Sequence, residues 1–181
     1  MDWSTVAPRI KAVALDVDGV LTDGTIAFGT AGSMKAFHAR DGHAIKLARR
    51  QGLLVGLLSG RADAANRALA REIELDFFFE GEKNKARAFT TLLARCELAA
   101  DEVLYVGDDV VDIPLLRRAG WGVAVADAPD EVRAAADEVT ALPGGRGAVR
   151  EVIARLLQAQ GLWDKALERY RGPQTESDRG R

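Results

Sequence analysis

Asp16 and Asp18 stand one residue apart at the end of a short apolar run, residues 13–15, and Gly19 follows them. A strand that ends this way delivers two carboxylates to the edge where parallel α/β sheets build their sites. Like charges repel, so both carboxylates stay ionised only with a cation or hydrogen-bond donors nearby. Oxygen ligands beside a tight glycine turn indicate Mg²⁺ rather than zinc.

A second acidic cluster, Asp108, Asp109 and Asp112, comes much later in the chain, again directly after an apolar run at residues 103–106. If the two runs are neighbouring strands, their carboxyl ends meet at one edge of the sheet. Both acidic clusters can then share one metal ion.

Two further strand-end residues fit a phosphate group. Ser59 precedes Gly60, and a hydroxyl in such a turn can donate to phosphate oxygens, although ordinary turn chemistry is the competing explanation. Lys85 opens a helical pattern, where the helix dipole disfavours a cation, so it is either a solvated surface lysine or part of a site. A carboxylate nucleophile, a hydroxyl, a lysine and an acidic pair together are what phosphoryl transfer needs.

The elements that position these residues alternate between short apolar runs and helical patterns, which is typical of a parallel sheet wrapped by helices. Asp41 is the expected N-cap of the first helix in this series. The pattern predicts an α/β fold, a doubly wound, Rossmann-like parallel sheet with helices on both faces. The expected strands lie at about 11–16, 53–58, 76–79, 103–107, 122–125 and 137–140, and the helices at about 41–52, 62–72, 83–96, 109–119, 130–136 and 147–160.

One segment, residues 25–38, breaks the alternation. Glycines separate two strand-like runs there, which predicts a β-hairpin that projects from the mouth of the site. An isolated two-stranded ribbon is marginal in water. Its apolar side chains therefore need a partner, either the body of the domain or another subunit; they are Ile26, Phe28, Met34 and Phe37.

Composition limits the function classes. The chain has 181 residues, 48% of them apolar, and a formal net charge of −2, which gives no support for nucleic-acid or membrane-surface binding. No apolar run approaches the roughly 20 residues that span a bilayer, and residues 1–9 lack the apolar segment of a signal peptide. The single cysteine, Cys96, fits a small core residue in a reducing compartment. A cytoplasmic location is expected.

The order of these signals resembles the haloacid dehalogenase-like phosphatases, which carry Asp-x-Asp-Gly, Ser/Thr, Lys and Gly-Asp-Asp motifs. Within that superfamily the chain is similar to the 3-deoxy-D-manno-octulosonate 8-phosphate phosphatases of lipopolysaccharide sugar biosynthesis. This similarity implies hydrolysis of that phosphorylated acid sugar with Mg²⁺ as the cofactor. It covers about residues 9–160 and rests on the stretches DVDGVLTDG (16–24), KAFHARDGHAI (35–45), LLSGR (57–61), GDDVVD (107–112) and GGRGAVREV (144–152).

The resemblance also implies the organisation of the molecule. It predicts one phosphatase domain over residues 9–160 without an inserted cap, with the hairpin as a flap, and a C-terminal tail at 161–181. The end of this tail, from Gly172, is polar and lacks periodicity, which predicts a mobile segment. Relatives form homotetramers in which four hairpins meet as a central barrel, so a neighbour would cover each site. Leu162, Trp163 and Tyr170 are expected to reach an adjacent subunit.

Residue roles follow by resemblance alone. Asp16 would attack phosphorus and form an aspartyl-phosphate. Asp18 would protonate the leaving oxygen and later deprotonate water. The metal would be held by Asp16, the backbone carbonyl of Asp18, and Asp108, and the phosphoryl oxygens by Ser59 and Lys85. Asp109 and Asp112 would orient Lys85 or a metal-bound water, with helix-surface solvation as an alternative for Asp112.

Three arginines and Gly60 are candidate substrate-binding residues. The sugar carries a carboxylate beyond its phosphate, and the planar guanidinium forks of Arg40, Arg61 and Arg146 suit that group. Salt bridges to nearby acids are the competing interpretation. His43 is expected on a helix face rather than as a catalytic base.

Alternative functions remain at this stage. A nine-carbon acid-sugar (KDN or sialic acid) 9-phosphate phosphatase is the nearest, but that branch tends to carry Glu where Arg61 stands and to lack Arg40-Asp41-Gly42. A phosphoaccepting receiver module uses similar residues, but its lysine comes last, whereas Lys85 precedes Asp108. A catalytically silent regulatory module is disfavoured by the intact Asp18.

Overall fold

The central sheet has six strands in the order β5-β4-β1-β6-β7-β8, and every neighbouring pair is parallel. The computed structural model describes residues 2–30 and 32–171. The chain builds one half of the sheet outward from β1 and then returns to start β6 beside it, so the strand order reverses at this pair. The strands are β1 Ala12–Leu15, β4 Leu54–Ser59, β5 Phe77–Glu80, β6 Val103–Gly107, β7 Trp121–Ala124 and β8 Glu138–Val139.

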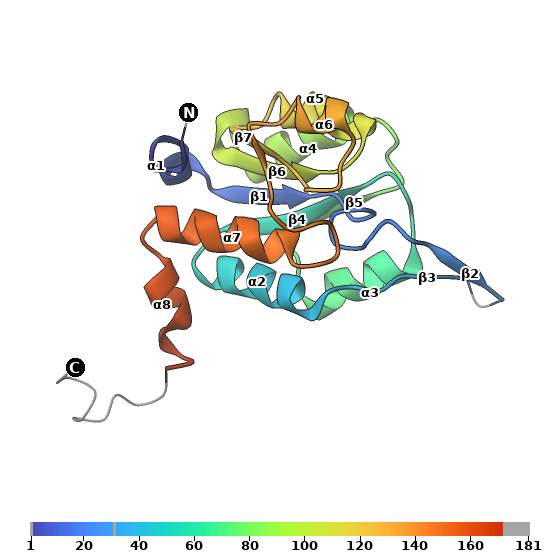
Figure 1. Ribbon diagram of the computed structural model, residues 1–181, viewed down its shortest axis with the longest axis horizontal. Coiled ribbons are helices and arrows are strands. Elements are labelled where there is room, and N and C mark those ends of the chain that lie inside the picture. Colours follow the sequence, from blue (N-terminus) through green and yellow to red (C-terminus); the bar gives the residue numbers. More distant parts are fainter. Residues whose placement is uncertain (1, 31, 172–181) are drawn as a thin grey trace.

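Helices cover both faces of the sheet, which confirms the predicted doubly wound α/β fold (Figure 1). On one face lie α2 Ala39–Arg50, α3 Ala64–Glu72 and α7 Ala148–Ala159; on the other lie α4 Lys85–Cys96, α5 Ile113–Leu116 and α6 Asp130–Arg133. Shorter elements are α1 Trp3–Val6, α8 Trp163–Glu168 and the 3-10 turns Ala7–Arg9, Ala100–Glu102 and Val110–Asp112. Among the helices described, none has the length and apolar character to cross a bilayer.

The core explains why the sequence pattern predicts these elements. All four residues of β1 are buried, because helices pack on both faces of this central strand. Helix α7 presents an apolar stripe at helical spacing to the sheet, and its members are all nearly inaccessible: Val149, Val152, Ile153, Leu156 and Leu157.

The predicted hairpin is present as β2 Ala27–Gly29 and β3 Gly32–Met34, with Phe28 opposite Ser33. It projects away from the body of the domain (Figure 1). Phe28 is 81% exposed and Met34 66% exposed, whereas Phe37 packs against the core. Between β1 and α2, the residues described form no element other than this hairpin.

The predicted capping role of Asp41 is wrong. Helix α2 begins two residues earlier, with His38 at its N-cap position, and Asp41 is fully buried in the first turn. Its Oδ1 accepts a hydrogen bond of 2.7 Å from the backbone N–H of Arg150 in α7. The N-cap position of α7 is Gly147, which has no side chain to offer, so Asp41 caps α7 from the neighbouring helix.

The helix predicted at 109–119 is also shorter and split. A 3-10 turn at Val110–Asp112 precedes the four-residue α5, which carries Pro114 at its start. Asp109 caps the turn, and the Asp112 carboxylate accepts backbone hydrogen bonds from the loop before it. These local bonds favour a tight first turn over a continuous α-helix.

The C-terminal segment, which is expected to reach an adjacent subunit, also has contacts within its own chain. It forms α8, and Trp163 lies under the Arg150 guanidinium at 4.6 Å. The Tyr170 hydroxyl accepts a hydrogen bond from Arg50 and pairs with His43, each at 2.9 Å, so this segment packs on α2 and α7 of its own chain. His43 lies on the α2 surface as predicted. The tail from Gly172 onward, expected to be mobile, lies outside the described residues.

Candidate active site

Asp16 and Lys85 form the buried centre of the site. Asp16 follows β1 directly, and its backbone N–H bonds to the carbonyl of Val106 in β6. Lys85 is the first residue of α4, and its ammonium lies 2.9 Å from Asp16 Oδ1 with only 5% of the side chain exposed. The unfavourable position of Lys85 at a helix start is therefore offset by the carboxylates that face its ammonium, and not by solvation.

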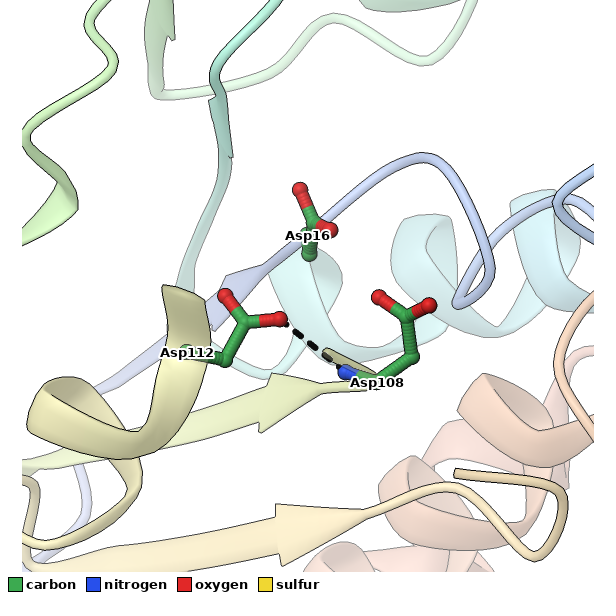
Figure 2. Close-up of side chains that lie close together, drawn as sticks. All are labelled: Asp16, Asp108 and Asp112. Carbon is green, nitrogen blue, oxygen red and sulfur yellow. Dashed lines mark hydrogen bonds between the residues drawn. The ribbon is translucent and has the colours of Figure 1, made fainter. Parts of the chain in front are cut away.

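Three carboxylates converge here, those of Asp16, Asp108 and Asp112, and each has an oxygen within 4.8 Å of the others (Figure 2). Asp112 is fully buried, and both its oxygens are engaged. Its Oδ1 lies 2.5 Å from Lys85 Nζ and accepts the Tyr105 hydroxyl at 2.5 Å. Its Oδ2 accepts the backbone N–H groups of Asp108 and Asp109.

Burial sets the electrostatics of this cluster. It raises the pKa of Asp16 to about 6, with Asp112 acting in the same direction and Lys85 against it. Burial, Asp16 and Asp112 likewise raise the pKa of Asp108. Burial opposes the charge on Lys85, but Asp16 and Asp112 outweigh it and raise the pKa of the ammonium. One lysine does not balance three carboxylates, so the site favours a further cation.

The oxygen atoms present fit a divalent metal ion. Asp108 Oδ1 is buried and has no hydrogen-bond partner among the residues described. A Cβ at Gly19 would lie 1.9 Å from Asp108 Oδ2, and Gly19 has a φ of +92°, so only glycine lets this carboxylate approach the loop after β1. Carboxylate oxygens and nearby backbone carbonyls are ligands that Mg²⁺ prefers.

Ser59 ends β4, the strand beside β1, and is 2% exposed. Its hydroxyl donates to the carbonyl of Arg61 and accepts from the side-chain amide of Asn66 at 3.3 Å. The backbone N–H of Arg61 also reaches Ser59 Oγ at 3.2 Å, which makes a compact turn at the carboxyl edge of the sheet. The edge that holds Asp16 therefore also carries a hydroxyl and backbone donors.

Asp18 lies between two cations. Its Oδ1 is 2.6 Å from Lys35 Nζ, and its Oδ2 is 3.6 Å from Arg61 Nε. Sequence reasoning missed Lys35, whose side chain is 0% exposed. Lysine is normally a surface residue, and nothing local marks this one, which appears in the sequence only as part of the stretch after the hairpin.

The remaining predicted residues are Arg40, Arg146, Asp109 and Gly60. Arg146 pairs with Asp23 at 3.4 Å, as its competing interpretation proposed. Arg40 is exposed and makes no ion pair with any residue that the structure describes. Asp109 accepts the backbone N–H of Val110 at 2.7 Å, and a Cβ at Gly60 would meet nothing within 4 Å.

A doubly wound sheet with a buried aspartate after its central strand, a facing lysine and a second acidic turn defines a metal-dependent phosphatase of the haloacid dehalogenase type. Residues 78–153 match the model of the haloacid dehalogenase-like hydrolase family. The chain is 42% identical to the 3-deoxy-D-manno-octulosonate 8-phosphate phosphatase KdsC of Escherichia coli strain B over 166 residues, which are 91% of this chain and 88% of that protein. The chain belongs to this phosphatase family.

Solved structures agree with this membership. The phosphatase from Moraxella catarrhalis, in complex with a magnesium ion, a phosphate ion and KDO, is 32% identical with a TM-score of 0.89, covering 93% of this chain and 97% of that one. The cobalt-bound enzyme from Haemophilus influenzae is 40% identical with a TM-score of 0.85, covering 87% and 93%. The receiver, regulatory and nine-carbon alternatives are not favoured.

Proposed function

We propose that this chain is a Mg²⁺-dependent phosphomonoesterase that hydrolyses 3-deoxy-D-manno-octulosonate 8-phosphate to the free sugar acid and inorganic phosphate. The observation that carries the proposal is the buried Asp16 carboxylate, which faces Lys85 at 2.9 Å within a cluster of three acids. Membership of a family of phosphatases at 42% identity supplies the substrate class.

The reaction takes two displacements at phosphorus. An Asp16 oxygen attacks the phosphoryl group in line, and the bond between phosphorus and the sugar oxygen breaks as Asp18 protonates that oxygen. Asp18 then takes a proton from water, which attacks the aspartyl-phosphate and releases phosphate. Lys85 and Ser59 hold the equatorial phosphoryl oxygens throughout, and Asp112 keeps Lys85 in place.

The metal would be held by Asp16, the backbone carbonyl of Asp18, and Asp108. When bound, Mg²⁺ offsets the negative charge of phosphate and carboxylate that would otherwise repel each other. Asp109 acts indirectly, because its carboxylate caps the turn that contains Asp112. Asp112 in that turn accepts the backbone N–H of Asp108 and so fixes the backbone that carries the Asp108 side chain.

Recognition of the sugar falls to the residues around the mouth. Arg61 is 60% exposed and its Nε lies 3.6 Å from Asp18 Oδ2, which supports a role in binding a carboxylate on the leaving group. Arg40 and Arg146 are the further candidates, with Gly60 leaving space beside Ser59. Arg146 would have to exchange its contact with Asp23 for the substrate.

The assembly proposed is a homotetramer built on the hairpins. Phe28 and Met34 are large and apolar, and the part of the chain that the structure describes leaves them 81% and 66% exposed. Closing four hairpins into a barrel removes their free edges and buries these side chains. A cytoplasmic location is part of the proposal, since the one cysteine, Cys96, is a free thiol.

A substrate panel tests this function. Phosphate release from octulosonate 8-phosphate, KDN 9-phosphate and p-nitrophenyl phosphate is measured with Mg²⁺ and with excess chelator. We expect the highest kcat/KM for octulosonate 8-phosphate and no turnover with chelator. Arg61→Ala should lower kcat/KM for octulosonate 8-phosphate more than for p-nitrophenyl phosphate, whereas Arg67→Ala, which removes an arginine paired with Glu80, should change neither. A wild-type preference for KDN 9-phosphate would contradict the proposal.

A further inference from the structure

Lys35 is a buried cation whose partners link the hairpin to the active site. Its side chain is 0% exposed, and its Nζ lies 2.6 Å from Asp18 Oδ1 and 3.6 Å from Asp63 Oδ2. The ammonium donates a hydrogen bond to Asn66 Oδ1 at 3.0 Å, whereas its contacts with the two carboxylates are ion pairs. A lysine persists in such a place only when its charge is paired, so these contacts define where the ammonium can lie.

The start of α3 supplies the other two partners of this lysine, Asp63 and Asn66. Asp63 is the N-cap of α3, where its Oδ1 accepts the backbone N–H of Ala65 at 2.8 Å. Its Oδ2 accepts the hydroxyl of Ser33 from β3 at 2.6 Å. Asp63 is therefore fixed by a helix and by the hairpin together, and it restrains Lys35.

Asn66 completes the restraint. It is fully buried, and while its carbonyl oxygen accepts from Lys35, its amide donates to Ser59 Oγ at 3.3 Å. The contacts run from Asp18 through Lys35 and Asn66 to Ser59. The same side chains thus connect the residue proposed as the acid and base with the residue proposed to hold the phosphoryl group.

Arg61, the other cation near Asp18, is a weaker restraint. It is 60% exposed and 3.6 Å away, and holding a long exposed side chain in one geometry costs conformational entropy. Lys35 is closer and enclosed. The orientation of the Asp18 carboxylate therefore depends mainly on Lys35.

We propose that Lys35 is a positioning residue that orients the Asp18 carboxyl group for its two proton transfers, from the protonated carboxyl to the leaving oxygen and from water back to the carboxylate. The inference rests on the proposed function, because it assumes that Asp18 is the acid and base. Proton transfer requires contact at about 2.6–3.2 Å, and a displacement of about 1 Å can cost about 100-fold in rate. Lys35 acts through Asp18 and does not hold the phosphoryl group.

Lys35→Met tests this role, since methionine is similar in length and apolar. We expect kcat for octulosonate 8-phosphate to fall about 10- to 100-fold, while the inhibition constant of inorganic phosphate changes less than about twofold. The loss should be smaller for p-nitrophenyl phosphate, because nitrophenolate leaves without a proton. Lys11→Met, which removes an exposed lysine paired with Glu102, is the control and should keep the wild-type rate.

A double-mutant cycle with Asp18→Asn decides whether Lys35 acts through Asp18. We expect Lys35→Met to cause no further loss of single-turnover rate in the Asp18→Asn background. Additive losses, an unchanged kcat in Lys35→Met, or phosphate inhibition weakened in parallel with kcat would each overturn the proposal. If Lys35→Met does not fold, Lys35→Gln takes its place with the same outcomes.

The cycle also separates this inference from the proposed function. A wild-type chain that ignores octulosonate 8-phosphate contradicts the substrate assignment, while the cycle still runs on p-nitrophenyl phosphate. A wild-type chain that hydrolyses the sugar phosphate, with additive losses in the cycle, contradicts only the role of Lys35.

Discussion

Individual functional residues of the site depend on neighbouring residues that position them without taking part in the reaction. Asp108 approaches the loop after β1 only because Gly19 lacks a side chain, and Lys85 is fixed because both oxygens of Asp112 are engaged. A carboxylate with all its hydrogen-bonding positions used by protein is a poor metal ligand, so Asp112 positions Lys85. The nearby Asp108, with a free buried oxygen, suits the metal.

Gly19→Ala should weaken Mg²⁺ binding. Its Cβ would meet Asp108 Oδ2 at 1.9 Å, and the backbone φ of +92° adds strain of about 1 kcal/mol or more. We expect the Mg²⁺ concentration for half-maximal activity to rise at least 10-fold in a magnesium titration. Gly24→Ala is the control, because it has a similar φ of +78° but its Cβ would meet nothing closer than 3.9 Å. Equal Mg²⁺ requirements in the two variants would contradict this account.

The sequence predicted the residues that stand at strand ends and could not predict those that reach the site from elsewhere. Asp16, Ser59 and Asp108 were found because parallel strands bring their carboxyl ends to one edge. Lys35 was not singled out, since its burial depends on Asp63 and Asn66 in a helix about 30 residues later. The sequence also allowed Asp112 to be a solvated residue on a helix surface, and its complete burial in the structure excludes that interpretation.

At the scale of elements, charged side chains tie the helices to the sheet. Arg49 of α2 makes two hydrogen bonds of 2.8 Å to Asp76, which precedes β5. Asp76 also accepts the backbone N–H of Val55 in β4 at 2.8 Å. One carboxylate thus joins three elements at the end of the sheet opposite the active site.

Asp76→Asn should lower the free energy of unfolding by about 1.5–3 kcal/mol at neutral pH, because hydrogen bonds to a charged group are lost. Burial acts to raise the pKa of Asp76, but the hydrogen bonds from Arg49 and Val55 outweigh it and lower the pKa from its ordinary 3.8. The contribution is therefore full above pH 3.8 and is lost as the pH falls through the lower, folded-state pKa.

Urea unfolding of wild type and Asp76→Asn from about pH 7 to about pH 2 measures this effect. The difference between the two should shrink in acid. Asp101→Asn is the control, since its pairing with Arg9 is 3.6 Å long and more than half exposed at the aspartate, and it should cost less than about 1 kcal/mol. A difference that stays constant down to the lowest pH would exclude the ionised pair as its source.

Element positions were predictable to within a few residues, but their junctions were not. The strands β1, β4, β6 and β7 lie where apolar runs indicated, because burial on both faces leaves a continuous signal. Asp41 was predicted to cap α2 but caps α7. Local N-cap preferences cannot show that α7 begins beside α2. The turn at 110–112 was predicted as part of a helix, because its apolar residues are compatible with an α-helix as well as with a 3-10 turn.

At the scale of the whole molecule, the described residues include no cap domain between β1 and α2. The hairpin is the only element described between β1 and α2. It projects from the body of the domain (Figure 1), and its Phe28 and Met34 side chains are exposed. The sequence predicted this projection from glycines between two strand-like runs. It could not show what covers the hairpin, and in the proposed assembly other copies of the chain complete that surface.

Phe28→Asp should dissociate the proposed tetramer and lower kcat/KM for octulosonate 8-phosphate, because a charge cannot be buried in an apolar barrel without a partner. Light scattering and activity at the same protein concentration measure both effects. Val139→Asp is the control, since it places a charge at a 38% exposed position on the edge strand β8, where charges are tolerated. A wild-type chain that is fully active as a monomer would contradict the assembly.

The central claim is that Asp16 carries the phosphoryl group during turnover. The most direct measurement is acid quenching of enzyme mixed with octulosonate 8-phosphate and Mg²⁺, followed by mass spectrometry of the peptide that contains Asp16. The account predicts a phosphorylated Asp16 in wild type and none in Asp16→Asn or with chelator, with turnover abolished in both. Full turnover by Asp16→Asn, or a phosphoryl group found on a different residue, would contradict it.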